Sequence, residues 1–120
     1  MGHEQVMAGL TKGIDLFNDG RYWEAHEAWE LDWMPDRKGP DSGFYKGLIQ
    51  IAAGCLHYTR RNRRGSVNKW RSGADYIRPY LPAHRGVQLA PLVDAVDGYL
   101  KAMGGRSWPD LTMPIIKTGS

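Results

Sequence analysis

The stretch from Tyr22 to Trp33, with the sequence YWEAHEAWELDW, constrains the fold of this chain more than any other. On a helix, which turns by about 100° per residue, many side chains of this region fall within an arc of about 140°. They are Tyr22, Trp23, His26, Trp29, Glu30, Trp33 and Met34. We expect this tryptophan-rich arc to face a core, where an ionisable group is costly unless it is paired or holds a ligand. The stretch therefore predicts a helix that carries a site at His26 and Glu30.

Composition indicates one helical domain, covering residues 1–120, with enough apolar residues to close a core. Of the 120 residues, 42% are hydrophobic, and the single cysteine, Cys55, excludes an internal disulfide. No apolar run approaches the roughly 18 to 20 residues needed to cross a bilayer, so we expect no membrane partner. The start of the chain lacks the apolar segment of a secretory signal, and we therefore expect a cytoplasmic location.

Helical periodicity predicts an all-α fold, a single-domain bundle of about five helices with an extended C-terminal tail. The expected helices cover residues 4–18, 22–34, 43–61, 66–78 and 89–103. A tight turn at Asn18-Asp19-Gly20 predicts that the first two helices form an antiparallel hairpin. Gly65 and Ser66 are expected to end the third helix and cap the fourth. We find no strand pair, phosphate-binding glycine loop, nucleophile elbow or paired-cysteine metal motif.

The third expected helix is apolar around nearly its whole circumference and is therefore central. One narrow stripe differs, because its members lie within about 80° of one another and are small or polar. They are Gly43, Gly47, Gln50, Gly54 and His57. Small residues permit close helix approach, so we expect this stripe to face the second helix and to bring His57 toward His26 and Glu30. Alternatively, the glycines only accommodate bulky tryptophans.

His26 and Glu30 place two potential metal ligands side by side on one helix, and His57 would complete a two-histidine, one-carboxylate set. Such a set suits a divalent metal, namely zinc, manganese or iron, and leaves coordination positions open. Glu27 follows the histidine as the general base does in zinc peptidases, although the second histidine of that motif is absent. A metal-dependent hydrolase with Glu27 as its catalytic residue is therefore one hypothesis.

The same residues also allow a purely structural interpretation. Polar pairs four residues apart are common on helices, so His26 and Glu30 could satisfy each other in a tryptophan-rich core, braced by Gln50 and His57. Under the functional interpretation, the pair opens onto a ligand pocket between the second and third helices. The residues expected to line that pocket are Trp23, Trp29, Trp33 and Gln50.

Two blocks of the sequence are similar to a known family. The first runs from Phe17 to Trp33 and contains His-x-x-x-Glu-x-x-Trp at His26, Glu30 and Trp33, and the second begins at Phe44 with Phe-Tyr-Lys-Gly-Leu-Ile-Gln. Over about residues 17–80 the chain resembles a small bacterial and archaeal domain-of-unknown-function family, number 309. The resemblance implies an all-helical fold and suspected metal binding at the His-Glu motif, and it implies no established activity.

The sequence allows two other classes of function. Asn18-Asp19-Gly20-Arg21-Tyr22 also looks like the turn of a tetratricopeptide repeat, so a helical module that binds a peptide or another protein is the alternative. The partners expected of the chain as a whole are a small molecule, a protein or a second copy of itself. A basic run could contact nucleic acid; it comprises Arg60, Arg61, Arg63, Arg64, Lys69 and Arg71. Charge runs are usually solvated faces and no recognition motif accompanies this one, so we expect no nucleic-acid partner.

Overall fold

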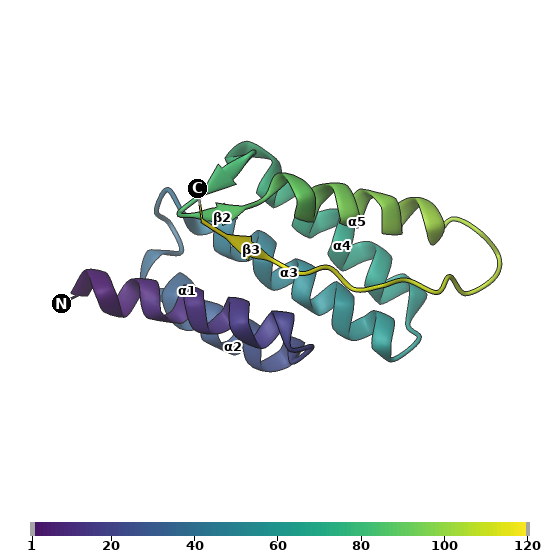
Figure 1. Cartoon of the computed structure of the whole chain (residues 1–120), viewed down its shortest axis with the longest axis horizontal. Helices are drawn as coiled ribbons and strands as arrows, with labels where there is room; N and C mark the ends of the chain where they lie inside the picture. The colour runs from purple at the N-terminus through teal and green to yellow at the C-terminus, as the bar shows by residue number, and fades with distance from the viewer. Residues whose placement is uncertain (1, 120) are drawn as a thin grey trace.

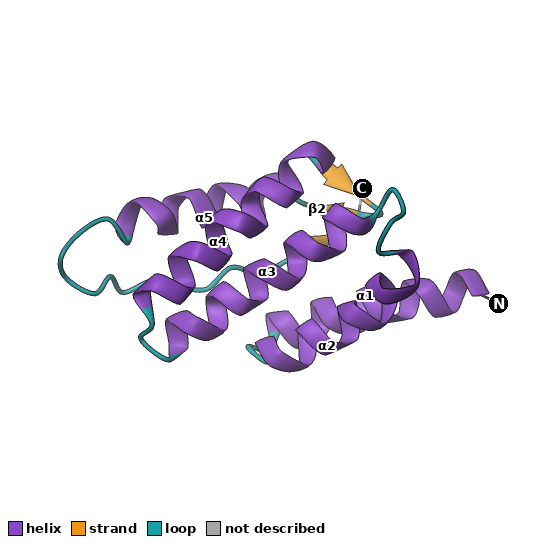
Figure 2. Ribbon diagram, turned by 180° about the vertical axis from the view of Figure 1, so that it is seen from behind, coloured by secondary structure: helices purple, strands orange, loops and turns teal. Residues whose placement is uncertain are grey.

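Five helices form the body of the protein, and the computed structural model describes residues 2–119, with the side chains of residues 2–8 and 36 outside that description. The helices are α1 (Gly2–Asn18), α2 (Tyr22–Trp33), α3 (Ser42–Thr59), α4 (Arg63–Ile77) and α5 (Ala90–Ala102), with short 3-10 turns η1 (Met34–Asp36) and η2 (Arg78–Tyr80). Figures 1 and 2 show α3 in the middle, with α1 and α2 on one side and α4 and α5 on the other. This arrangement confirms the predicted all-α bundle.

The reversals at the ends of α1 and α3 use the same backbone motif. After α1, Gly20 has a φ of 80° and the Arg21 N–H donates to the Leu16 carbonyl at 2.9 Å, as in a Schellman cap. After α3, Arg61 takes the left-handed position with a φ of 56°, and the Asn62 N–H donates to the carbonyl of His57 at 2.9 Å. The chain therefore turns back sharply at both places, as expected for the first hairpin.

The fourth helix begins earlier than the sequence indicates. Asn62, rather than Ser66, is its N-cap, because the Asn62 Oδ1 accepts a hydrogen bond from the Gly65 N–H at 2.9 Å. Gly65 lies inside the first turn of α4 and does not end α3. The predicted cap pair was wrong because a non-glycine residue, Arg61, occupies the left-handed position that sequence analysis assigns to glycine.

The glycine stripe of α3 faces α4, so the prediction that it faces the second helix was wrong. A Cβ added at Gly73 of α4 would lie 2.9 Å from the Gly47 carbonyl oxygen and 2.9 Å from the Ile51 backbone nitrogen. A Cβ at Gly54 would overlap the indole of Trp70, which is fully buried. The alternative, that the glycines accommodate a bulky tryptophan, therefore holds at Gly54, and the absence of side chains brings the backbones of α3 and α4 together.

A small antiparallel sheet closes one end of the bundle. It consists of β1 (Ala83–His84), β2 (Val87–Gln88) and β3 (Lys117–Thr118), in the order β1-β2-β3. Arg85 and Gly86 form the β1–β2 turn with φ values of 48° and 75°, the geometry of a type I′ hairpin. The expectation of no strand pair was wrong because strands of two residues are too short to show alternation.

The C-terminal tail is extended, as predicted, and returns along the bundle in front of α3 (Figure 1). Tyr58 donates to the Pro109 carbonyl at 2.8 Å, and Tyr99 donates to the Thr112 carbonyl at 2.5 Å. The Asn18 side chain donates to the carbonyl of Ile116 at 2.9 Å and accepts from its N–H at 2.8 Å. These side chains provide hydrogen-bond partners for the backbone of the tail, which, within the described residues, has no neighbouring strand along most of its length.

Within residues 2–119, none of the helices combines the length and the apolar character that crossing a lipid bilayer requires.

The close approach of α3 and α4 predicts opposite effects for two glycine substitutions. Gly73→Ala should destabilise the protein by about 1–3 kcal/mol, because the added methyl group meets backbone atoms that side-chain movement cannot relieve. Gly98→Ala on α5 is the matched control: nothing lies within 4 Å of its Cβ, so it should stabilise by about 0.5–1 kcal/mol. Urea unfolding measures both, and equal effects would contradict the tight α3–α4 contact.

Candidate functional site

A pocket of about 180 Å³ lies between α2 and α3. Its lining is aromatic and apolar for the most part, with two imidazoles and one guanidinium. The lining residues are Tyr22, Trp23, His26, Ala53, Leu56, His57 and Arg60. Burial raises the pKa of Tyr22 to about 12, so its phenol stays protonated at neutral pH.

His26 and Glu30 meet as a pair on α2. The His26 Nε2 lies 3.4 Å from a carboxylate oxygen of Glu30, and the side chains are 24% and 42% exposed, respectively. Because Nε2 faces an acceptor, we assign the hydrogen to Nε2, which leaves the His26 Nδ1 as an acceptor. That Nδ1 is buried and has no hydrogen-bond partner among the described residues. The Trp23 ring lies against His26 with 5.1 Å between ring centroids.

The expectation that the whole aromatic arc of α2 faces a core was wrong. Tyr22 and Trp29 are buried, but Trp23 is 56% exposed and Met34 is 49% exposed. The arc is broader than the contact that α2 makes with α1 and α3, so its edge faces solvent. The carboxylate of Glu30 therefore lies at the boundary of the protein rather than in its interior.

His57 lies in the same pocket as His26, and its hydrogen-bonding state follows from Asn62. The Asn62 Oδ1 accepts from the Gly65 N–H, so its Nδ2 is the group that lies 3.3 Å from the His57 Nδ1. An amide nitrogen donates, and the His57 Nδ1 must therefore accept. The His57 Nε2 then carries the hydrogen, which makes it a donor and not a metal ligand in this arrangement.

The predicted three-ligand metal set is not assembled in this arrangement. In the part of the chain that the structure describes, no three or more side chains of His, Cys, Asp and Glu are grouped so that they could hold a metal ion. His26 and Glu30 are neighbours, while the Nδ1 lone pair of His57 is used by Asn62. The side chains therefore fit a two-residue polar pair better than a resident metal centre, and metal binding stays a prediction.

The other predicted site residues lie in different surroundings. Glu27 is exposed and lines a groove between α1 and α2, away from the pocket. It is therefore not placed to act as a general base on a ligand bound beside His26. Trp29 is fully buried and donates from Nε1 to the Leu10 carbonyl at 3.2 Å. Trp33 is half-buried and donates to the Ser42 hydroxyl. Gln50 is half-buried and is not among the described residues that line the pocket.

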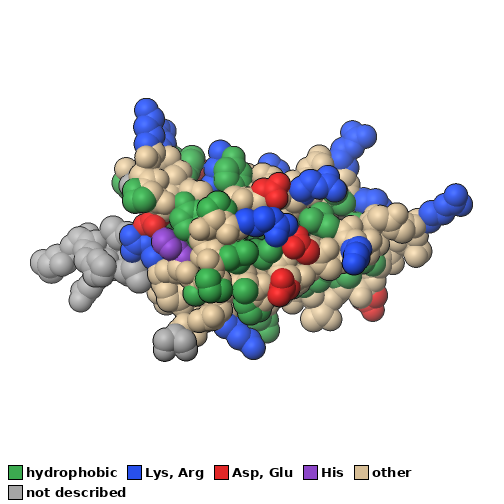
Figure 3. All heavy atoms as spheres, turned by 90° about the horizontal axis from the view of Figure 1, so that it is seen from above, with side chains coloured by type: hydrophobic (Ala, Val, Ile, Leu, Met, Phe, Trp, Pro, Cys, Tyr) green, Lys and Arg blue, Asp and Glu red, His purple; other side chains and the backbone are tan. Residues whose placement is uncertain are grey.

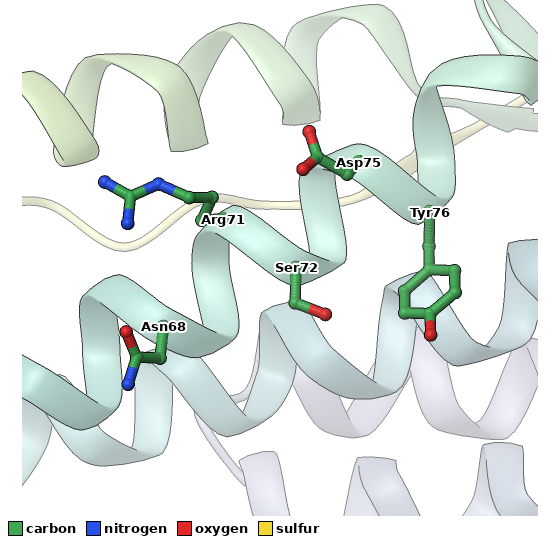
Figure 4. A pocket seen from close by; sticks show the side chains of 5 residues that line it. All are labelled: Asn68, Arg71, Ser72, Asp75 and Tyr76. Carbon is green, nitrogen blue, oxygen red and sulfur yellow. The ribbon is translucent and has the colours of Figure 1, made fainter.

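A second depression lies on α4 and is shallow. Figure 4 shows that its lining side chains all come from this one helix, with Arg71 and Asp75 pointing away from Ser72 and Tyr76. Side chains that diverge from a single helix do not surround a ligand. We therefore assign no site to this depression.

A cluster of charged side chains that the sequence did not predict joins the sheet to α3. Asp41 is 7% exposed, accepts from His84 Nε2 at 2.7 Å and is bound by the Arg85 guanidinium at 2.5 Å. Burial acts to raise the pKa of Asp41, but the hydrogen bonds from Arg85 and His84 outweigh it and hold that pKa below its usual range. The His84 ring packs against Phe44 and Tyr80. More than forty residues separate the partners, so no local pattern could have found them.

Comparison with protein families adds one finding. Residues 10–68 match the family of a domain of unknown function, DUF309. This match supports the resemblance found in the sequence, and the matched segment contains every described residue of the pocket between α2 and α3. No curated protein matches the chain. The DUF309 match carries no activity, so the geometry of the pocket is the guide to function.

The exposure of the His26–Glu30 pair sets how much it contributes to stability. A double-mutant cycle with His26→Ala and Glu30→Gln should give a coupling free energy of about 0.3–1 kcal/mol, as for surface pairs four residues apart. Urea unfolding of the four proteins measures it. A coupling near 3 kcal/mol would instead indicate a buried, desolvated pair.

The Asp41 cluster predicts a specific acid sensitivity. Because the pKa of Asp41 is lower in the folded than in the unfolded chain, its contribution to stability is complete above the unfolded value of about 3.9 and is lost as the pH falls through the folded value. The melting temperature of Asp41→Asn should therefore fall less between about pH 5 and pH 2 than that of the wild type. Asp110→Asn, at an exposed carboxylate, is the control and should follow the wild type.

Proposed function

We propose that this protein binds a small organic anion in the pocket between α2 and α3. The observation that carries the proposal is the set of nitrogen donors in the pocket: the Arg60 guanidinium and the His57 Nε2–H contribute to its lining, and no carboxylate is among the described residues that do so. Cationic and neutral nitrogen donors that converge without a competing carboxylate favour a carboxylate or phosphate group. The half-exposed Trp23 and the side chain of Leu56 provide apolar surface for the body of the ligand.

The size of the pocket limits the ligand. Its volume of about 180 Å³ is below the roughly 300–1,000 Å³ of sites for drug-sized molecules. A short carboxylic acid, an aromatic acid with one ring, or a small phosphate ester suits this volume. In the proposed complex the His57 Nε2–H and the Arg60 guanidinium donate to the anion, and the Glu30 carboxylate fixes the ring of His26.

A divalent metal is the second candidate ligand. The observation in its favour is the His26–Glu30 pair itself, in which an imidazole and a carboxylate lie 3.4 Å apart on one helix. A bound ion would take its remaining ligands from water or from the substrate. Because Glu27 lines another groove, we do not extend this candidate to a hydrolytic reaction.

Thermal unfolding with defined anions tests the proposal. Acetate, benzoate or inorganic phosphate at about 100 times its Kd should stabilise the folded protein by about 2.7 kcal/mol and so raise the melting temperature by several degrees. Arg60→Gln should remove most of this shift. Arg64→Gln, at an exposed arginine that does not line the pocket, is the matched control and should keep it.

Three outcomes separate the candidates. A shift that Arg60→Gln removes and Arg64→Gln retains supports the anion proposal. A melting temperature that ignores every anion but rises with zinc, manganese or ferrous iron after chelator treatment would replace it with the metal candidate. Equal losses in Arg60→Gln and Arg64→Gln would mean that anions act on the general charge of the protein and not in the pocket.

A further inference from the structure

Exposed arginines gather at the end of the bundle where α3 turns into α4. Arg60, Arg61 and Arg64 come from this turn, and Arg106 comes from the turn that follows α5; we call these four residues the basic tip. Figure 1 shows both turns at the same end of the molecule, and Figure 3 shows Lys and Arg side chains projecting from that end. The fold thus joins a basic run in the sequence to a cation that lies far from it along the chain.

Arg63 holds the two turns together. From the first turn of α4 its guanidinium donates to the Met103 carbonyl at 2.5 Å, to the Ser107 carbonyl at 2.9 Å and to the Arg106 carbonyl at 3.4 Å. Hydrogen bonds from a charged donor are about twice as strong as neutral ones, so the position of Arg106 is well determined. Arg63 therefore has a structural role, because it joins the start of α4 to the turn that follows α5.

In the part of the chain that the structure describes, no carboxylate forms an ion pair with the basic tip. Among the described residues, the arginines in ion pairs are Arg21, Arg78 and Arg85, all outside the basic tip. Arg61 lies over the ring of Trp108 at 5.4 Å, a contact that leaves its charge in place. One exposed carboxylate, Asp110, follows in the tail. Four exposed guanidinium groups against one carboxylate leave a strongly positive surface.

We propose that the basic tip binds the phosphodiester backbone of single-stranded nucleic acid. Guanidinium groups pair with phosphate oxygens through two parallel hydrogen bonds, and the cations of the basic tip are all arginine. Several cations that are separated on the surface favour binding of a polymer with one phosphate per nucleotide over binding of a single small anion.

A membrane surface fits this region less well. Proteins that lie on anionic bilayers combine cations with apolar side chains that enter the lipid. Among the side chains that the structure describes, the large exposed hydrophobic residues lie outside the basic tip; they are Trp23, Leu31, Met34, Leu81 and Ile115. The sequence alone argues against nucleic acid because no recognition motif accompanies the basic run. The contacts proposed here need no such motif, because they are made to the backbone and do not select bases.

Fluorescence anisotropy with a labelled oligouridine of about 20 nucleotides tests the proposal, at salt concentrations from about 50 to 200 mM. The wild type should bind with a salt-dependent affinity. The double variant Arg64→Ser, Arg106→Ser should bind several-fold more weakly, and the slope of log K against log salt should become shallower by about 1.4, since each phosphate contact to a single strand contributes about 0.7. Neither residue lines the pocket between α2 and α3, so this result is independent of the proposed anion site.

The matched control is Arg37→Ser, Lys38→Ser, which removes the same charge from exposed positions at the opposite end of α3. It should keep the wild-type slope, and circular dichroism checks that both variants are folded. No binding by the wild type at about 50 mM salt, or equal weakening in the two double variants, would overturn the proposal. Binding to phosphatidylserine vesicles without binding to oligouridine would overturn it in favour of a membrane.

Discussion

The contact between α3 and α4 is the constraint on which the rest of the structure depends. Gly47 and Gly73 bring the two backbones together, and the buried rings of Trp70 and the side chain of Ile77 fill the space beside them. On the opposite side of α3, facing α2, the lining residues have side chains, such as Leu56. The pocket lies between these side chains and α2. The two faces of α3 therefore differ, because glycines bring α4 close on one face and larger side chains line a pocket on the other.

The sequence predicted the helices well because helical periodicity is a local property. It did not predict which helix the glycine stripe faces, because a stripe of small residues shows that some helix comes close without showing which one. Both α2 and α4 carry a tryptophan that needs such a site. The Trp29 ring packs at Gly13 of α1, while the Trp70 ring packs at Gly54 of α3. The choice between these pairings is made by tertiary packing.

The same distinction applies to the candidate site. The pairing of His26 with Glu30 could be predicted, because residues four apart on a helix are neighbours. Their exposure could not, since it depends on how far α1 and α3 cover α2. The cluster of Asp41 and His84 lay beyond prediction for another reason: it joins a helix start to a hairpin that the sequence does not reveal. Long-range polar contacts of this kind produce no periodic pattern in the amino-acid sequence.

Asn62 links the pocket to the basic tip. Its N–H closes α3 at His57, its Oδ1 caps α4 at Gly65, and its Nδ2 donates to the His57 ring. The first two contacts determine where α4 begins, and therefore where Arg63 meets the end of α5. The third contact determines which nitrogen of His57 is a donor in the pocket. One asparagine, at a turn that depends on the left-handed conformation of its predecessor Arg61, thus supports both proposed binding surfaces although the two use different ligands.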